Sequence, residues 1–405
     1  MEQKDIPVLL LTGYLGSGKT TLVNHILANK QGLRFAVIVN DIGEVNIDAE
    51  LIERQGVVNS KNESLVALQN GCICCTLRTD LIDQLYELMK MQCFDYILIE
   101  ASGICEPEPI AQTICQIPEL GKGYTKYGIC RMDAIVTVVD ALRMRDEFAS
   151  GEALNRKDLG EDDIEKLLIQ QIEFCNLVLL NKASEVSDKE RTRIREIIHT
   201  LQPKARIIEC DYADVDLSLL VNTRMFSFQH VATSAGWIRE INRSLEDIET
   251  EEKEHHHHHE EHEEHGHEGH GHHHHHHEEG EAEEYGISSF VYYRRKAFDM
   301  NKFDYLICNE WPRSVIRCKG VCYFADDRNM SYLFEQAGQQ KLLSEAGQWY
   351  AAMDPTKLML IMQQEPGLVS EWDEQYGDRM QKLVFIGQKM NREEITRMLD
   401  ACLED

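Results

Sequence analysis

Residues Gly13 to Thr20 read Gly-Tyr-Leu-Gly-Ser-Gly-Lys-Thr, the spacing of a phosphate-binding loop. They follow the apolar run Ile6 to Leu11 and precede a helix-forming stretch, Thr21 to Asn29. Glycines in such a turn let backbone N–H groups close around phosphates, and the helix N-terminus adds positive potential. The order of strand, glycine turn and helix therefore predicts that the chain binds a nucleoside triphosphate.

The residues of this loop have separate expected roles. Lys19 should reach the β- and γ-phosphates, and Thr20 should ligate Mg²⁺. The loop residues that we expect to contact the nucleotide are Gly13, Gly16, Ser17, Gly18, Lys19, Thr20 and Thr21.

A carboxylate ends the apolar run Tyr96 to Glu100, and Gly103 follows three residues later. Taken alone, an acidic residue after a strand is commonly a helix cap or a solvated turn. Beside a phosphate loop, Glu100 can hold Mg²⁺, often through water, and Gly103 lets the backbone approach the γ-phosphate. We therefore predict catalytic roles for Lys19, Thr20 and Glu100.

Asn181 and Lys182 end another apolar run, and Ala183 and Ser184 follow them. The segment resembles the Asn-Lys-x-Asp motif of GTPases, in which Asn and Lys pack around the base and Asp pairs with the guanine N1 and N2 protons. Ser184 stands at the Asp position and cannot offer two fixed acceptor oxygens. The substitution predicts a weaker guanine preference unless Glu185, one residue later, replaces the carboxylate.

Three cysteines lie within four residues, at Cys72, Cys74 and Cys75. Thiolates favour Zn²⁺, Cu(I) or iron–sulfur clusters, and three of them leave a tetrahedral site open at its fourth position. Glu44 is the first candidate for an added oxygen ligand, although acidic loop residues are as often simply solvated. Buried inert thiols and exposed redox-active thiols are the alternatives to a metal site.

A histidine tract runs from His255 to His277 and holds 15 of the 18 histidines, interleaved with Glu and Gly. Such a composition cannot form a packed core. Many imidazoles on one segment give weak, exchangeable sites for Zn²⁺, Ni²⁺, Co²⁺ or Cu²⁺, so the tract is predicted to be a metal reservoir or a metal-capturing arm. The representative ligands that we expect in its two runs are His255, His257, His259, His272, His274 and His276.

The elements that would position these groups alternate along the chain. The apolar runs that indicate buried strands are residues 34–40, 94–100, 132–140, 175–181 and 205–209, after the first at 6–11. The amphipathic stretches that indicate helices between them are residues 78–90, 107–115, 164–174 and 189–201. This alternation predicts an α/β fold with a mainly parallel sheet and ligands at the carboxyl ends of its strands.

Composition sets limits on the function. With 42 Lys and Arg against 70 Asp and Glu, the formal net charge is −28, which opposes binding to nucleic acid or anionic membranes. No apolar run approaches the roughly 18 residues of a membrane span. The 13 cysteines show no disulfide framework, so we expect a cytoplasmic, reduced protein.

The motifs together resemble the CobW-like GTPases, P-loop proteins related to the urease and hydrogenase maturation GTPases. The resemblance rests on Gly13 to Thr20, Asn40 to Asp48, Asn70 to Cys75, Glu100 to Gly103, and Asn181-Lys182, and covers nearly the whole chain. The strand and helix pattern ends near Phe228 and a new folded segment begins at Tyr285, so we expect a P-loop GTPase domain at 1–228, a linker at 229–284 and, as the resemblance implies, a smaller α+β C-terminal domain at 285–405. The resemblance also implies that GTP hydrolysis is linked to delivery of zinc, or of cobalt or another metal, to client proteins.

The expected function is thus a GTP-hydrolysing metallochaperone that uses GTP, Mg²⁺ and Zn²⁺, with Co²⁺ or Ni²⁺ as other possible cargo. The C-terminal domain is expected to recognise a metalloprotein client, and a homo-oligomer is compatible with these features. Two alternatives stay open. One is a metal storage or buffering protein with a structural nucleotide, and the other is an insertase for cobalt or another metal in a cofactor pathway.

Overall fold

The computed structural model describes residues 5–28, 32–39, 67–68, 78–103, 105–147, 162–241, 286–364, 368–369 and 372–404. The contact pattern divides the chain into two compact units, Met1–Gly236 and Trp237–Asp405. Each unit has its own sheet and its own apolar core.

The N-terminal unit is built on a parallel sheet of seven strands in the order β3-β2-β4-β1-β5-β6-β7. Most of these strands are nearly continuous apolar runs and are buried on both faces, as parallel strands usually are. The strands are β1 (Asp5–Thr12), β2 (Phe35–Val39), β3 (Ala67–Leu68), β4 (Tyr96–Glu100), β5 (Ile129–Asp140), β6 (Leu177–Asn181) and β7 (Arg206–Glu209).

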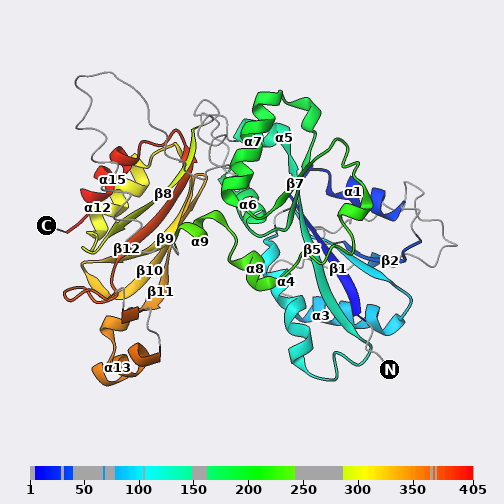
Figure 1. Ribbon diagram of the computed structural model, residues 1–405, viewed down its shortest axis with the longest axis horizontal. Coiled ribbons are helices and arrows are strands. Elements are labelled where there is room, and N and C mark those ends of the chain that lie inside the picture. The colour runs from blue at the N-terminus through cyan, green and yellow to red at the C-terminus, as the bar shows by residue number, and fades with distance from the viewer. Residues whose placement is uncertain are drawn as a thin grey trace, which may run out of the picture. The chain divides into compact units, whose positions relative to one another are not determined.

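Helices connect the strands and lie on both sides of the sheet (Figure 1). They are α1 (Lys19–Leu27), α3 (Arg78–Met91), α4 (Pro107–Gln116), α5 (Ala141–Glu147), α6 (Asp162–Glu173), α7 (Asp188–Leu201) and α8 (Phe228–Ala232). The start of α7 is fixed by a reciprocal capping box between Ser187 and Glu190. The predicted α/β alternation is therefore confirmed, with element ends shifted by a few residues.

The register of the sheet places the ends of its strands at one edge. Leu11 of β1 and Val39 of β2 both pair with Glu100, and Asp140 of β5 pairs with Asn181. The loops that follow these strands therefore start side by side, which is where α/β proteins bind ligands.

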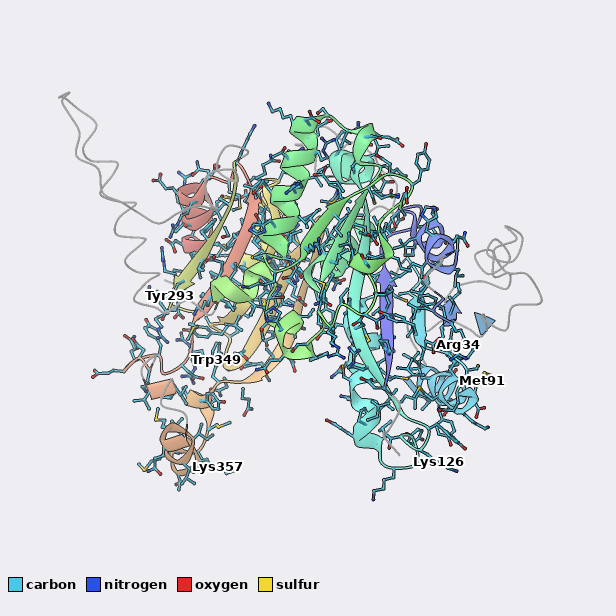
Figure 2. All side chains as sticks on the ribbon, turned by 45° about the vertical axis from the view of Figure 1, so that its right-hand side comes forward. Arg34, Met91, Lys126, Tyr293, Trp349 and Lys357 are labelled. Atoms are coloured by element: carbon cyan, nitrogen blue, oxygen red, sulfur yellow. The ribbon has the colours of Figure 1, made fainter. Side chains whose placement is uncertain are left out.

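Two polar contacts lie toward the amino-terminal ends of the parallel strands. Just before β2 and β4, Arg34 and Asp95 form a two-pronged ion pair, with Nε–Oδ2 and Nη2–Oδ1 distances of 2.9 and 2.8 Å (Arg34 is labelled in Figure 2).

The second contact is made by Asp133 of β5, which is fully buried. Its carboxylate accepts hydrogen bonds from Tyr96 Oη at 2.6 Å and from the backbone N–H groups of Thr223 and Arg224 at 3.0 and 2.7 Å. A buried carboxylate needs such donors, and these fasten the segment after β7 to the sheet.

The C-terminal unit contains an antiparallel sheet of five strands in the order β11-β10-β9-β12-β8. Aromatic residues of α12 and the strands, with Ile395 and Leu399 of α15, fill one face of it, and Trp237 and Ile241 of α9 pack into the cluster on the other. The elements are α9 (Gly236–Ile241), β8 (Ile287–Arg294), α12 (Met300–Tyr305), β9 (Val315–Phe324), β10 (Asp327–Ala337), β11 (Gln340–Gln348), α13 (Pro355–Gln364), β12 (Gln381–Gln388) and α15 (Arg392–Asp400). This unit is the expected smaller α+β domain.

The segment that we expected to be a linker, 229–284, begins with ordered structure. Most of α8 and all of α9 lie inside it, and Val231 and Ala235 are buried. These short helices carry too few periodic apolar residues to stand out from the polar sequence around them. Residues 242–285, including the histidine tract, lie outside the described residues.

Candidate functional site

The loop between β1 and α1 has the backbone shape of a phosphate cradle. Gly13 has φ +136°, and a Cβ atom there would lie 2.3 Å from the backbone oxygen of Val138. Gly18 has φ +111° and caps α1, and its Cβ would lie 2.4 Å from Asn181 Nδ2. Neither position tolerates a side chain. The loop thus leads through glycine-only conformations into the N-terminus of α1, which is the kind of site that attracts anions.

Lys19 is held over this loop. Its ammonium group donates to the backbone oxygens of Gly13 at 2.8 Å and Tyr14 at 3.3 Å, and the residue is only 7% exposed. The Ser17 hydroxyl is buried and has no hydrogen-bond partner among the described residues. A buried cation and a buried open hydroxyl in one loop fit an anionic ligand that would contact both.

Thr20 and Glu100 meet beside the loop. The Thr20 Oγ1 atom donates to Glu100 Oε1 at 3.1 Å, and Glu100 is 2% exposed. Glu100 ends β4, the neighbour of β1, so the sheet register brings the two residues together across 80 positions of sequence. A hydroxyl and a buried carboxylate are oxygen ligands of the kind that Mg²⁺ takes next to a bound phosphate. The donor set therefore fits this ion.

Gly103 approaches the phosphate loop closely. A Cβ atom at this position would lie 2.8 Å from the backbone nitrogen of Leu15. Gln171, fully buried in α6, donates from Nε2 to the backbone oxygens of Gly103 at 3.3 Å and Cys105 at 3.2 Å. The loop after β4 is thus held against the phosphate loop by a side chain from a third element.

Asn181 connects three loops at the carboxyl edge of the sheet. Its Nδ2 atom donates to the backbone oxygen of Ser17, and its Oδ1 atom accepts from the backbone N–H of Ala213 at 2.9 Å. Cys210 lies next to it, with its Sγ atom 3.8 Å from Asn181 Oδ1. Burial, with a smaller contribution from the charge of Asp211, raises the pKa of the Cys210 thiol to about 11, so it stays a neutral thiol at pH 7.

Lys182 adopts a left-handed conformation, with φ +58°. Its ammonium group forms an ion pair with Asp140, which ends β5. Asp140 also accepts hydrogen bonds from the backbone N–H groups of Leu142 and Arg143, at 2.9 and 3.3 Å, at the start of α5. The Lys182 side chain is thereby held across the strand ends.

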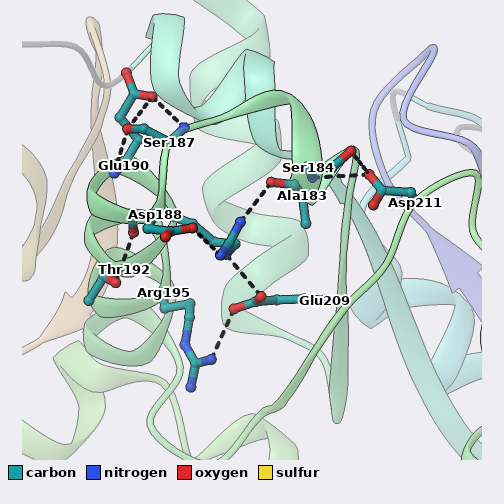
Figure 3. Close-up of polar contacts among 10 residues, drawn as sticks. Ala183, Ser184, Ser187, Asp188, Glu190, Thr192, Arg195, Glu209 and Asp211 are labelled. Carbon is teal, nitrogen blue, oxygen red and sulfur yellow. Dashed lines mark hydrogen bonds and ion pairs between the residues drawn. The ribbon is translucent and has the colours of Figure 1, made fainter.

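The Ser184 position is in contact with a carboxylate from another loop. Asp211 Oδ1 accepts hydrogen bonds from the backbone N–H of Ser184 at 3.1 Å and from its hydroxyl at 2.9 Å (Figure 3). Glu185, the expected substitute for the missing Asp, is exposed, and its side chain makes no hydrogen bond within the described ranges.

Three residues of this edge were not predicted: Asp140, Asp211 and Ala213. Asp140 and Asp211 lie at or just after the ends of strands that the sequence pattern does predict. The rule that ligands bind at the carboxyl ends of parallel strands is a signal that would have selected them.

The predicted loop residues and Glu100, Gly103, Asn181 and Lys182 do lie together, whereas the predicted metal ligands cannot be placed. Glu44, Cys72, Cys74, Cys75 and the histidines from His255 to His277 lie outside the described residues. Within the described residues, no group of three or more His, Cys, Asp or Glu side chains is arranged to hold a metal ion. Nor do those ranges contain a helix with the length and apolar character of a bilayer span.

Comparison with known families gives two matches along the chain. The family described as "CobW/HypB/UreG, nucleotide-binding domain" matches residues 7–209. The family described as "Cobalamin synthesis protein cobW C-terminal domain" matches residues 287–403.

Three curated proteins illustrate the similarity. The zinc-regulated GTPase metalloprotein activator 1 of Dictyostelium discoideum is 36% identical over 419 residues, which cover 98% of this chain and 80% of that protein. The zinc chaperone CobW of Pseudomonas aeruginosa is 34% identical, over 56% of this chain and 62% of its own length. The zinc chaperone YjiA of Escherichia coli is 31% identical, over 56% of this chain and 65% of its own length.

Proposed function

This chain belongs to the CobW/HypB/UreG family of nucleotide-binding proteins, and from that premise we propose that it is a GTP-hydrolysing metallochaperone for zinc. The observation that carries the proposal is the contact of Thr20 with Glu100 beside the phosphate loop. A hydroxyl and a buried carboxylate at this place suit a nucleotide–metal complex that is cleaved. The choice of zinc as the metal is supported by relatives that are named as a zinc-regulated GTPase and as zinc chaperones.

In this proposal, residues of the phosphate loop bind the triphosphate and Lys19 neutralises charge on it. Thr20 and Glu100 would hold Mg²⁺, which supplies charge neutralisation on the phosphate oxygens. Gly103 keeps the backbone close to the terminal phosphate. Asn181 and Lys182 frame the base at the neighbouring strand ends.

Zinc is the cargo, and Cys72, Cys74 and Cys75, with Glu44, are the proposed ligands. The chain enters the cysteine segment from β3, which ends at the same edge of the sheet as β2, and leaves it into α3 at Arg78. Both ends of the segment are thus fixed to the unit that carries the nucleotide loop. The histidine tract would collect exchangeable metal.

The C-terminal unit is proposed to recognise the client metalloprotein, and the cytoplasm is the proposed compartment. The ten described cysteines are all free thiols, which suits a reducing compartment.

Hydrolysis is proposed to release the metal. Loss of the γ-phosphate relaxes loops that contact it, so the GTP state would assemble the thiolate site and the GDP state would loosen it. Linkage then requires that GTP and zinc raise each other's affinity by the same factor, about 5- to 150-fold.

The test is the zinc affinity of protein lacking residues 255–277, measured without nucleotide, with GDP and with a non-hydrolysable GTP analogue. We expect tightest binding with the analogue, and no such difference after Cys72, Cys74 and Cys75 are changed to serine. Lys19→Ala is the control for nucleotide action and should abolish both hydrolysis and the effect on zinc. Equal zinc affinity in all three states would favour the storage alternative, and a native metal other than zinc would favour an insertase.

A further inference from the structure

The loop after β7 places the carboxylate of Asp211 next to Ser184, the position at which the chain lacks an aspartate. Guanine-reading motifs place an Asp at the position of Ser184, and here Asp211 contacts both the backbone N–H and the hydroxyl of Ser184. Figure 3 shows the two side chains facing each other, each from its own loop.

Asp211 is held in place by its neighbours in sequence. Cys210 before it is buried against Asn181, and Ala213 after it donates its backbone N–H to the same Asn181 side chain. Tyr212 and Ala213 have φ angles of +53° and +55°. Non-glycine residues adopt this conformation only when their surroundings impose it. The turn therefore presents Asp211 beside the two residues, Asn181 and Lys182, that frame the base.

We propose that Asp211 is the carboxylate that reads the guanine base, with Ser184 as its positioning residue. A carboxylate has about four acceptor sites, and Ser184 uses two of them on Oδ1. About two sites remain, which is the number that the guanine N1 and N2 protons require. The carboxylate thus comes from the loop after β7 instead of from position 184, and the chain keeps the guanine preference of a GTPase with the usual Asp.

Glu185 is the competing reader, and the contacts favour Asp211. Glu185 is exposed, and nothing within the described ranges orients its carboxylate, so binding a base would have to order a long side chain. Asp211 is partly buried and already oriented by two donors.

The inference rests on the proposed function, because it assumes that the nucleotide is GTP. Nucleoside diphosphates allow the base-reading inference to be tested apart from the proposed function, because their binding reports base preference without hydrolysis or zinc transfer. The experiment measures the binding of GDP, inosine diphosphate and xanthosine diphosphate to the full-length protein with Mg²⁺.

Wild-type protein should bind GDP at least about tenfold more tightly than inosine diphosphate, which lacks the N2 donor. Asp211→Asn should reverse the preference toward xanthosine diphosphate. An amide accepts from N1–H with its oxygen and donates to the xanthine O2 atom with its nitrogen. The matched control Glu185→Gln should leave the ratio of affinities within about threefold.

A pair of swap variants covers the case in which Asp211→Asn does not fold. Asp211→Ser should lose discrimination, and Ser184→Asp alone should place two carboxylates against each other and weaken GDP binding. The double variant Ser184→Asp with Asp211→Ser should restore the preference for GDP.

Three results would overturn the assignment. They are equal binding of GDP and xanthosine diphosphate by wild-type protein, an unchanged ratio in Asp211→Asn, or no restoration in the double variant. If any of these occurs while nucleotide-dependent zinc binding persists, the base reader is wrong and the proposed function stands. Tight, selective GDP binding that Asp211→Asn reverses, without any effect of nucleotide on zinc, would support the base reader and contradict the proposed function.

Discussion

Asn181 donates a hydrogen bond from its side-chain nitrogen to the backbone oxygen of Ser17, 164 residues earlier, over 2.8 Å. Its oxygen accepts a hydrogen bond from the Ala213 backbone N–H at the same time, so one buried amide fixes the loop after β1 and the loop after β7 relative to each other. Both groups of the amide are in use, and only glutamine, which is one methylene longer, carries the same donor and acceptor pair.

Asn181→Asp should therefore lower nucleotide affinity by about tenfold or more. The new oxygen would face the Ser17 oxygen, and a buried unmatched pair costs about 1–3 kcal/mol. The matched control is Asn176→Asp just before the same strand, where Asn176 joins Ile135 and Met225 far from the site. Denaturant unfolding and GDP titration of both variants separate stability from binding. Equal losses of affinity would show that Asn181 acts through general stability alone.

Glu100→Gln should reduce GTP hydrolysis on the order of 10²-fold and raise the Mg²⁺ concentration required. The substitution keeps the shape of the side chain but removes the charge that, in the proposed function, stabilises the metal–phosphate complex. Phosphate release measured across a Mg²⁺ series checks this. Glu209→Gln, at the end of β7 where Glu209 pairs with Arg191 and Arg195, is the control and should leave the Mg²⁺ dependence unchanged. An unaltered Mg²⁺ requirement in Glu100→Gln would assign the carboxylate a structural role.

Gly103→Ala should slow hydrolysis by roughly tenfold while GDP binding changes less. The added methyl group meets the Leu15 backbone nitrogen, and relieving such overlap costs about 1–3 kcal/mol. Gly123→Ala introduces the same methyl group where nothing lies within 4 Å, so it controls for the substitution itself. Single-turnover hydrolysis is the measurement. A Gly103→Ala protein with wild-type rates would mean that the loop after β4 does not follow the terminal phosphate.

Cysteine reactivity should separate the proposed zinc ligands from the structural thiols. Burial raises the pKa of the Cys130 and Cys175 thiols to about 12, so at pH 8 roughly one in 10⁴ is a thiolate. Iodoacetamide at pH 8 should leave these two unmodified and label Cys72, Cys74 and Cys75, together with the exposed Cys308.

Zinc should protect the three clustered cysteines and leave Cys308 reactive, as mass spectrometry of the digested protein would show. Protection of Cys308 by zinc, or modification of Cys72, Cys74 and Cys75 at the same rate with and without zinc, would remove the thiolate site.

Deleting residues 255–277 should lower the number of zinc ions bound per chain and leave one tighter site. The two ligand sets differ in softness and lie apart in sequence. Replacing the histidines of the tract by glutamine at constant length should have the same effect, which excludes a change of linker length as the cause. Metal titration with a competing chelator is the measurement, and unchanged stoichiometry in both variants would contradict a reservoir.

Much of the nucleotide half was predictable because its signals are local. The phosphate loop lies within eight residues of sequence, and the buried strands of the N-terminal unit are apolar runs that need no partner to be recognised. The contacts of Asp211 with Ser184 and of Lys182 with Asp140 span 27 and 42 residues. They depend on which strands become neighbours, and a single strand's composition does not encode that order.

The C-terminal sheet was less visible for a different reason. The strand β9, Val315–Phe324, includes Arg317, which is 2% exposed. Arg317 and Lys319 face Glu335 of β10 at 3.5 and 2.6 Å. Buried charges that are paired across strands interrupt the apolar pattern that sequence reasoning relies on. The strands β10 and β11 were not predicted, because their apolar residues are interspersed with charged and amide side chains.

The Asp133 carboxylate decides where the chain can be shortened. The parallel sheet ends at Glu209, and a fragment that stopped there would contain every strand of that sheet and every proposed nucleotide-contacting residue except Asp211. It would also remove the Thr223 and Arg224 donors from the buried Asp133 carboxylate, which would keep only Tyr96 Oη and Arg131 as partners, and the loss of two hydrogen bonds to a buried charge costs on the order of 1–3 kcal/mol each. A fragment that continues past Phe226, whose N–H bonds to the Asp133 backbone oxygen, keeps this anchor. The smallest self-sufficient N-terminal piece is thus set by the segment after β7, which also adds Leu220 and Val221 to the apolar core, and not by the last strand.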